Sequence, residues 1–353
     1  MSDSQAIKID PEQSARLAGL RYVTDEMPGI RRKKWGRGFS YFDIAGDRIG
    51  DRTVIQRIKV LAIPPSWEGV WICPLPNGHL QATGRDAKAR KQYRYHAEWR
   101  SIRSQAKFNR LIDFGQVLPE IRRQVDQDLR RRKLGREKVV ATVIRLLDTT
   151  HIRIGNPEYA RENNSFGLTT LRNRHVSIFG TELLFTFQGK SGVQQEKALT
   201  DRRLARVIQQ CQEIPGYELF QYYDEVGQKQ TVNSEDVNAY LQAVTGKDFT
   251  AKDFRTWGGT VEATKALIAL GSAESETQAK KNVVAAVKQA AEKLGNRAAT
   301  CRKYYVHPQI LQSYQADQLI ATWQYLEVAE ASNSQLSLEL IEQKLIAFLE
   351  ESS

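Results

Sequence analysis

Tyr305 is the side chain whose sequence surroundings most strongly suggest chemistry. It ends the basic, polar stretch Gly295–Tyr305, in a chain of 353 residues with a formal net charge of +11. A phenol in cationic surroundings can be held near a phosphate and, once it loses its proton, can attack the phosphorus. The neighbouring Tyr304 has the same chemistry, so this stretch alone leaves two candidate nucleophiles.

Three cations upstream lie in contexts that suit the same anion. Arg153 follows the apolar segment Val139–Leu147, where it could instead cap the end of a helix. Lys190 is expected at the tip of a hairpin, where an ordinary turn lysine is the plainer interpretation. Arg255 follows Lys252 by three residues at a predicted helix start, so the two share a face near the partial positive charge that favours phosphate.

The spacing of other residues argues against nucleotide and metal chemistry. The segment Phe187–Ser191 resembles part of a phosphate-binding P-loop, but Leu184 stands where that motif needs its first glycine, and the loop lies between two strands. The five histidines have no ligand spacing, and no cluster of carboxylates indicates a two-metal site. We therefore expect no nucleotide, no metal and no other cofactor.

The composition favours a polyanionic partner. Charged residues make up 26% of the chain, and basic clusters occur at Arg31–Trp35, Arg85–Tyr95 and Arg130–Lys133. In the second cluster Gln92 could contact a base edge, and the two tyrosines could bond phosphates. A single charge run is usually only solvated. Three of them, one interleaved with tyrosines, favour nucleic acid.

The cysteines and the apolar runs bear on the compartment. Cys73, Cys211 and Cys301 are isolated, which fits a reducing cytoplasm. The first residues are polar and lack an apolar signal core. No apolar run approaches the ~18 residues of a membrane span. We expect a cytoplasmic protein with no membrane partner.

The sequence pattern changes near residue 97. Before it, glycine and proline separate short strand-like runs, with a possible short helix at Arg52–Leu61, which predicts a small β-rich domain over 1–97. After it, helical spacing dominates, which predicts a larger, mainly helical domain over 98–353. The strand-like runs of the first domain are Phe39–Ile44, Val70–Cys73 and Leu80–Thr83.

The second domain is expected to contain one β insert among its helices. The predicted helices are Leu118–Lys133, Lys138–Thr149, Arg202–Cys211, Asp236–Thr245, Ala279–Leu294 and an acidic one at Leu336–Glu350. The predicted strands of the insert are His175–Phe179, Leu183–Phe187 and Val193–Ala198. The fold class is therefore α+β.

Taken in order, these pieces resemble the poxvirus-type type IB DNA topoisomerases in their bacterial form. The resemblance runs from about Leu20 to Tyr305 and beyond. Its motifs, in chain order, are Gly84–Tyr95, Ile152–Gly155, Gly167–Leu171, Gly189-Lys190, Lys252–Gly258 and the Tyr305 segment. Any one of them is weak, but their order is specific.

The resemblance implies a role for each matched residue. Arg153, Lys190, Arg255 and Tyr305 match the catalytic positions, and the spacing selects Tyr305 over its neighbour. Asn296 stands where poxvirus members carry a histidine; it can donate a hydrogen bond to a phosphate oxygen but carries no charge. The residues implied to contact DNA are Arg85, Lys88, Arg90, Lys91, Gln92, Tyr93, Tyr95, Tyr159 and Lys252.

The resemblance further implies a clamp around duplex DNA, built on the catalytic fold shared with tyrosine recombinases. The activity implied is relaxation of supercoiled DNA through a 3′-phosphotyrosyl link, by a monomer acting on the nucleoid without ATP or metal. Two alternatives stay open at this point: a tyrosine site-specific recombinase and a non-enzymatic DNA-binding protein. The preferred cleavage sequence is not determined by these residues.

Overall fold

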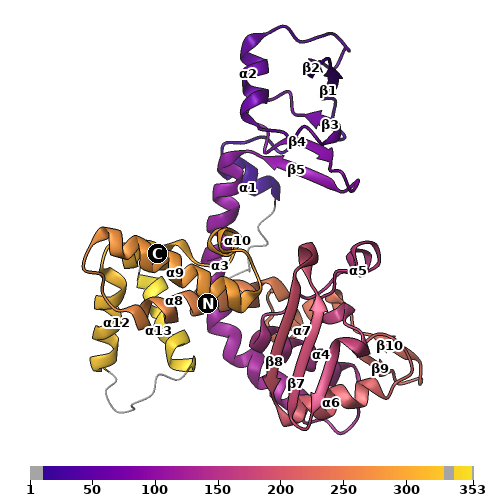
Figure 1. Cartoon of the computed structure of the whole chain (residues 1–353), viewed down its shortest axis with the longest axis vertical. Helices are drawn as coiled ribbons and strands as arrows, with labels where there is room; N and C mark the ends of the chain where they lie inside the picture. The colour runs from indigo at the N-terminus through magenta and orange to yellow at the C-terminus, as the bar shows by residue number, and fades with distance from the viewer. Residues whose placement is uncertain (1–10, 330–337, 352–353) are drawn as a thin grey trace, which may run out of the picture. The chain divides into compact units, whose positions relative to one another are not determined.

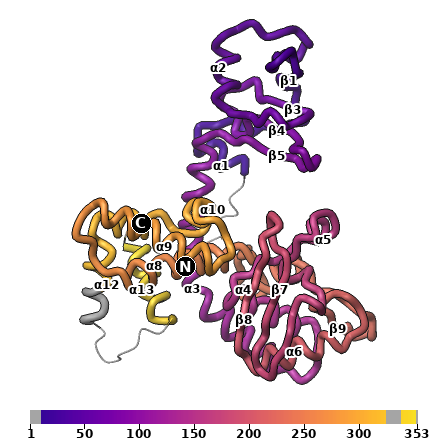
Figure 2. Tube along the Cα trace, in the orientation of Figure 1, coloured from indigo at the N-terminus to yellow at the C-terminus, as the bar shows by residue number. Residues whose placement is uncertain are grey.

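A computed structural model describes residues 11–329 and 338–351, and the side chains of 324–329 are not described. The chain divides into two compact units, Met1–Asn109 and Arg110–Ser353. Figure 1 draws their elements and Figure 2 the Cα trace. Among the described residues, no helix is both long and apolar enough to cross a bilayer. Mixed helices and antiparallel sheets confirm the predicted α+β class.

A five-stranded antiparallel sheet organises the first unit. Its strand order is β2-β1-β3-β4-β5. The bounds are β1 Ile30–Trp35, β2 Gly38–Phe42, β3 Glu68–Ile72, β4 Leu80–Arg85 and β5 Lys91–Tyr95. Two helices accompany it, α1 (Pro11–Leu17) and α2 (Arg52–Val60), and Asp51 caps α2 by accepting hydrogen bonds from the first turn.

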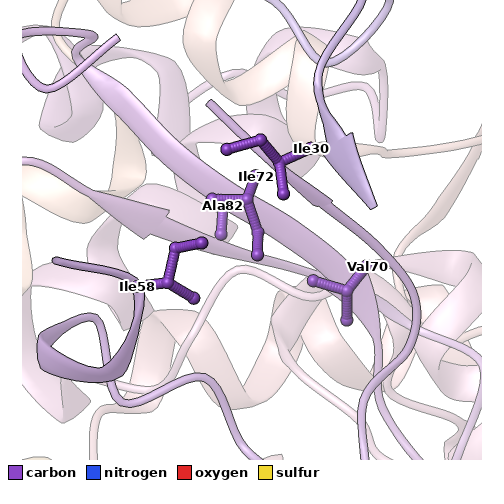
Figure 3. Packing of buried hydrophobic residues seen from close by; sticks show 5 residues of the cluster. All are labelled: Ile30, Ile58, Val70, Ile72 and Ala82. Atoms are coloured by element: carbon purple, nitrogen blue, oxygen red, sulfur yellow. The ribbon is translucent and has the colours of Figure 1, made fainter. Parts of the chain in front are cut away.

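The core of this unit lies where α2 covers the sheet. Ile58 of α2 packs with Ile30, Val70, Ile72 and Ala82 from three neighbouring strands, as Figure 3 shows. All five are buried. The short, glycine-punctuated runs therefore form one β layer because each has an apolar residue to place against the same helix.

Two sequence predictions need correction. The run Arg31–Trp35 was predicted only as a basic cluster, but it is strand β1, and Arg32 donates to the backbone oxygen of Trp67 at 2.6 Å. The helix predicted at Leu118–Lys133 is α3, which extends from Ala97 to Leu129. Its first turns consist mostly of charged and polar residues, so they lack the apolar periodicity by which a helix is recognised in a sequence.

The second unit consists of helices around a small sheet. The helices after α3 are α4 Arg136–Thr150, α5 Pro157–Asn163, α6 Arg202–Gln212, α7 Ser234–Thr245, α8 Ala251–Leu270, α9 Glu276–Leu294, α10 Ala298–Tyr304, α11 Pro308–Gln315, α12 Gln318–Ala329 and α13 Leu338–Glu351. Three short 3₁₀ turns are η1 Leu168–Thr170, η2 Asn173–His175 and η3 Lys190–Gly192. Figure 1 shows two groups in this unit, one that includes α8, α9, α10, α12 and α13 and one of the sheet with α4, α6 and α7.

The sheet of the second unit is antiparallel, with the order β6-β7-β8. Its strands are β6 Val176–Phe179, β7 Glu182–Gln188 and β8 Gln194–Thr200, as the predicted insert requires. A second sheet of two strands, β9 Gln221–Tyr223 and β10 Lys229–Thr231, was not predicted. Strands of three residues are too short to show the alternation by which a strand is recognised.

The last helix is joined to the centre of this unit by a network of charges. Arg122 of α3 donates to Asp148 of α4 at 2.8 Å and to Glu342 of α13 at 2.6 Å, and Trp257 of α8 donates to Glu342 at 2.8 Å. Burial alone would lower the pKa of Arg122, but its hydrogen bonds to the two carboxylates outweigh burial and raise it. Glu342, one of the acidic residues of the predicted helix, is buried in this network. The predicted start of this helix at Leu336 lies outside the described residues.

We predict that Glu342→Ala destabilises the protein because it leaves the Arg122 charge short of a partner in a mostly buried place. The free energy of unfolding, measured by urea denaturation, should fall by about 3 kcal/mol. Glu350→Ala, on the exposed side of the same helix, is the matched control and should change it by less than about 0.5 kcal/mol. Equal effects of the two substitutions would contradict the structural role of Glu342.

Candidate active site

Tyr305 follows the last residue of α10 and faces a pocket of about 690 Å³ in the second unit. Its backbone N–H donates to the carbonyl of Cys301 at 2.8 Å, and its own carbonyl accepts from Thr260 of α8 at 3.3 Å. These bonds fix the backbone from which the phenol projects. The pocket also contains Arg153, Lys190 and Asn296.

The turn that carries Arg153 is held by the Gly167–Leu171 motif. The N–H of Leu168 donates to the carbonyl of Arg153 at 2.8 Å, and Thr169 donates to the carbonyl of Ile154 through both its N–H and its hydroxyl. A Cβ at Gly167 would lie 2.5 Å from the Arg153 carbonyl oxygen. Glycine is therefore required by the close approach of two backbones, and this second motif acts by positioning Arg153.

The Arg153 side chain points to Asn296 rather than to the end of the preceding helix. Its Nη2 donates to Asn296 Oδ1 in a short hydrogen bond. Since arginine only donates, this contact orients the amide with Nδ2 as its donor end. Nδ2 is buried and has no hydrogen-bond partner in the described part of the chain. The amide therefore keeps a donor for another acceptor at the pocket.

Lys190 begins the turn between β7 and β8, as the hairpin prediction requires. The N–H of Gly189 donates to the carbonyl of Val193 at 2.8 Å and closes the turn, while Ser191 has a φ of +65°. The lysine side chain is exposed, and no hydrogen bond or ion pair to it is found within the described ranges. Its ammonium is free to follow a ligand in the pocket.

Arg255 lies beneath the pocket and is 3% exposed. Its Nη1 donates to the carbonyl of His151 at the end of α4, and its Nη2 donates to the carbonyl of Leu294 at the end of α9, at 2.9 Å. Its guanidinium carbon lies 5.0 Å from the centre of the Tyr305 ring. Burial lowers the pKa of Arg255 to about 10, with a smaller contribution from the charge of Arg153, so it stays charged at neutral pH.

These cations change the acidity of the phenol. Burial by itself would raise the pKa of Tyr305. The charges of Arg255 and Arg153, a hydrogen bond from Arg255, and the charge of Lys252 act in the opposite sense and leave the pKa below its usual 10.0. The site therefore stabilises the phenolate, the form that can attack phosphorus, more than water does.

Lys252 stands at the start of α8, where sequence analysis placed it. Asp253 accepts from the backbone N–H of Thr250 at 2.8 Å and from its hydroxyl at 3.0 Å, which confirms the predicted start of the helix. Lys252 lines the pocket, whereas Arg255, three residues later, is buried behind it. One helix start thus supplies two charges to the same site.

The pair Gly258-Gly259 in α8 has a positioning role that the sequence did not reveal. A Cβ at Gly258 would clash with the imidazole of His151, and a Cβ at Gly259 would lie 2.5 Å from the carbonyl oxygen of Tyr305. The two glycines let the helix approach His151 and Tyr305, both of which Arg255 contacts. Burial lowers the pKa of His151 to about 4, so this ring is neutral at physiological pH.

The predicted DNA-contacting residues of the first unit lie on the hairpin of β4 and β5. Asp86 accepts from Arg90 at 2.7 Å and from the Gln92 amide at 3.0 Å, so these two side chains are held by the loop itself. Hydrogen bonds, chiefly that from Arg90, lower the pKa of Asp86 to about 2. Tyr93 and Tyr95 stack with their rings 5.9 Å apart.

The other cations of this hairpin are also ordered by neighbours. Arg85 donates to the carbonyl of Ala89 at 2.8 Å, and Lys91 pairs with Asp25 at 2.7 Å. Lys88 is exposed in the loop. The hairpin therefore presents a partly neutralised basic edge with two stacked phenols.

The remaining predicted contacts, Tyr159 and Lys252, lie in the second unit, and Lys252 lines the pocket described above. Tyr159 is on α5, with 48% of its surface exposed. The third basic cluster, in contrast, follows α3 and is paired internally: Arg130 contacts Asp126 at 2.8 Å and Arg131 contacts Asp128 at 2.6 Å. This cluster is in part a local ion-pair network.

The chain matches two family models. Residues 96–331 match the model described as eukaryotic DNA topoisomerase I, catalytic core, and residues 38–86 match that of the bacterial DNA topoisomerase IB, N-terminal domain. The first match covers most of the second unit, including every residue of the pocket described above.

Curated relatives carry the same description. The DNA topoisomerase 1B of Acanthamoeba polyphaga mimivirus is 33% identical over 296 residues, which span 82% of this chain and 88% of the viral protein. The DNA topoisomerase 1B of Vaccinia virus (strain Copenhagen) is 28% identical over 149 residues, 40% of this chain and 46% of that protein. The same shares hold for DNA topoisomerase I of Monkeypox virus.

We predict that Gly259→Ala destabilises the protein, although alanine is the better helix former. Helix propensity alone would raise the free energy of unfolding by up to about 1 kcal/mol. The new methyl group would meet the Tyr305 carbonyl, and this overpacking should lower it by about 1–3 kcal/mol instead. Urea denaturation measures the difference.

Ala269→Gly, near the exposed end of the same helix, provides the reference for propensity without a clash. It should lower the free energy of unfolding by no more than about 1 kcal/mol. A Gly259→Ala protein that is more stable than the parent would show that the close approach to Tyr305 does not constrain this helix.

Proposed function

The chain belongs to the type IB DNA topoisomerase family, and on that premise we propose that Tyr305 cuts one DNA strand by bonding to its phosphate. The bond from Tyr305 Oη to phosphorus forms while the bond from phosphorus to the 5′-oxygen breaks. A 3′-phosphotyrosyl link and a free 5′-hydroxyl result. The nicked duplex then swivels, torsion relaxes, and the 5′-hydroxyl attacks the phosphorus and releases Tyr305.

One observation carries this proposal: side chains from four separate segments meet in one pocket. Tyr305, Arg153, Lys190 and Asn296 line it, and Arg255 contacts the phenol ring from below. A protein that only bound DNA would need positive charge but no such convergence around a phenol. The lowered pKa of Tyr305 is a second support, because it favours the nucleophilic form.

The two arginines suit the charge that develops on the non-bridging phosphate oxygens. Arginine stays ionised, and its planar fork can bind two oxygens at once. Arg153 reaches the pocket directly, while Arg255 acts from its buried position against Tyr305. Asn296 adds a neutral donor through Nδ2, the amide end that Arg153 leaves available.

Lys190 is the proposed general acid. The leaving 5′-oxygen needs a proton as its bond to phosphorus breaks, and an ammonium on a mobile side chain at the pocket can deliver it. In the return step the same group accepts the proton back. The phosphotyrosyl bond keeps the energy of the broken link, so we propose that neither nucleotide nor metal is consumed or required.

We propose that residues 1–97 form a DNA-binding domain and residues 98–353 the catalytic domain of a clamp. The basic edge of the β4–β5 hairpin supports the first assignment. Tyr159 and Lys252 would add contacts from the catalytic side. All five proposed active-site residues come from one chain, so a monomer is sufficient for the reaction. Because the proposed substrate is DNA, we place the activity at the nucleoid in the cytoplasm. The family assignment favours this activity over the recombinase.

We predict that the protein relaxes supercoiled plasmid in EDTA without nucleotide and that Tyr305→Phe abolishes both relaxation and covalent capture. The phenylalanine lacks the oxygen that bonds to phosphorus, but it keeps the charges that bind DNA. Gel electrophoresis of topoisomers measures relaxation, and denaturing electrophoresis of a labelled nicked substrate measures capture. Binding by the variant, measured by gel shift, should stay within about threefold of the parent.

Tyr304→Phe is the matched control, because it removes a hydroxyl from the adjacent, half-exposed tyrosine. This protein should still be captured on DNA. Capture that survives in Tyr305→Phe but is lost in Tyr304→Phe would assign the chemistry to the other tyrosine.

The pH dependence of cleavage should report the lowered pKa of Tyr305. In a single turnover the rate rises as the phenol loses its proton, and the rise should level off below pH 10 because the site favours the phenolate. Lys252→Ala removes one of the charges responsible, so its inflection should move to higher pH. Lys265→Ala, which removes a charge elsewhere on the same helix, should leave the inflection in place. A profile unaffected by Lys252→Ala would contradict this electrostatic role.

A further inference from the structure

Gln195 of β8 is a buried polar side chain that the mechanism above does not use. It is 8% exposed and forms part of the pocket wall. Its only side-chain hydrogen bond within the described ranges is a long one, from Nε2 to the carbonyl of the adjacent Gln194 at 3.4 Å. Buried amides usually form good hydrogen bonds, so hydrogen bonding does not explain why a glutamine occupies this position.

Two glycines enclose this side chain. A Cβ at Gly189 would lie 2.8 Å from Gln195 Cγ, and a Cβ at Gly295 would clash with the Gln195 amide oxygen. Gly189 has a φ of −93°, which any residue adopts, so glycine there serves the close contact rather than the backbone. Gly295 has a φ of +61°, so both its backbone and its contact favour glycine.

The two glycines belong to the two segments that must be brought together for catalysis. Gly189 precedes Lys190 in the hairpin, and Gly295 precedes Asn296 in the loop after α9. The side chain of Gln195 fills the space between them. Gln195 thus lies against the residue before Lys190 and the residue before Asn296.

Neighbouring contacts bind the end of α9 to the same place. Lys197, two residues after Gln195 on β8, donates to the carbonyl of Lys293, and Arg255 donates to the carbonyl of Leu294. Burial, with smaller effects from the charges of Arg255 and Lys293, lowers the pKa of Lys197. The end of α9 is therefore a junction of strand β8 with helix α8, and Gln195 is the part of that junction that touches the hairpin.

We infer that Gln195 is a positioning residue that sets the place of Lys190 relative to Asn296 and Tyr305. The inference rests on the proposed function, in which Lys190 protonates the leaving 5′-oxygen. Lys190 has a long, exposed side chain, so only the base of its hairpin can restrict where the ammonium reaches. A displacement of about 1 Å can cost about 100-fold in rate when a proton must be delivered in the transition state.

The test compares two leaving groups in single-turnover cleavage. One substrate has the ordinary phosphorus–O5′ bond; in the other, sulfur replaces that oxygen. When Tyr305 attacks the second substrate, the phosphorus–sulfur bond breaks and a thiolate leaves without a proton, because a thiol has a pKa of about 8.5. A defect in proton delivery should therefore appear with oxygen and disappear with sulfur.

We predict that Gln195→Ala slows cleavage of the oxygen substrate by about 10–100-fold. With the sulfur substrate its rate should return to within about threefold of the parent, since no general acid is needed. Gly189→Ala disturbs the same contact from the hairpin side and should behave alike. It keeps Gln195, so it tests the inference even if Gln195→Ala folds poorly.

Gln221→Ala is the matched control. Gln221 is also buried, its Nε2 donates to the carbonyl of Glu218 at 2.6 Å, and a Cβ at Gly216 would lie 2.6 Å from its amide oxygen. It lies on β9 and is absent from the pocket lining. If a glutamine has only a structural role, its substitution by alanine should lower the stability of the protein but should change the cleavage rates of the oxygen and sulfur substrates by the same factor.

Lys190→Ala separates this inference from the function on which it rests. It should slow the oxygen substrate by about 10²–10⁴-fold and recover with sulfur. If Lys190→Ala does not recover, Lys190 is not the general acid, and both proposals fall. If Lys190→Ala recovers but Gln195→Ala and Gly189→Ala are equally slow on both substrates, or are not slowed at all, the proposed function stands and the role of Gln195 is refuted.

Discussion

The buried guanidinium of Arg255 is the interaction on which the arrangement of the site depends. It binds the last turn of α4 through the carbonyl of His151 and the end of α9 through that of Leu294, and it faces the ring of Tyr305. Charge removed from water this completely requires fixed partners, and the two carbonyls provide them. The same charge lowers the pKa of the phenol, so one group both holds the pocket together and makes the proposed nucleophile more acidic.

Close backbone approach is the second constraint, and it explains motifs that contain no chemically active side chain. Gly167 meets the backbone at Arg153, Gly259 meets that at Tyr305, and Gly189 and Gly295 meet Gln195. Each side chain proposed to act on the phosphate projects from a segment that glycine allows to lie unusually near another. Side chains in a catalytic site must be held to a fraction of an ångström. A methyl group added at one of these glycines would therefore displace a site residue and lower the reaction rate without touching the substrate.

The proposed catalysis and the proposed binding of duplex DNA depend on different kinds of contact: buried charges at the pocket and exposed ion pairs on the hairpin. In the second unit the cations at the pocket are proposed to act on one phosphate, where burial strengthens their effect. On the hairpin of β4 and β5, Asp86 pairs with Arg90 and Asp25 pairs with Lys91 at the surface, where water and salt weaken ion pairs. Such a hairpin can follow many sequences of duplex, whereas the pocket demands one geometry of its phosphate.

The sequence by itself determined the α+β class, most of the helices of the second unit and the β insert with Lys190 in its turn. It also pointed to Arg153, Lys190, Lys252, Asn296 and Tyr305, which the structure places in one pocket. Helical periodicity, turn residues and short motifs each depend on residues close together in the chain, so they can be recognised from the sequence. It did not reveal β1, whose basic side chains hid the strand, nor the extent of α3, nor the burial of Glu342. Only the tertiary structure decided that Arg153 turns to Asn296, that Arg255 is buried beneath Tyr305, and that Gln195 lies between two glycines. Those are contacts between residues up to 143 positions apart, and no local pattern encodes which distant backbone a side chain will meet.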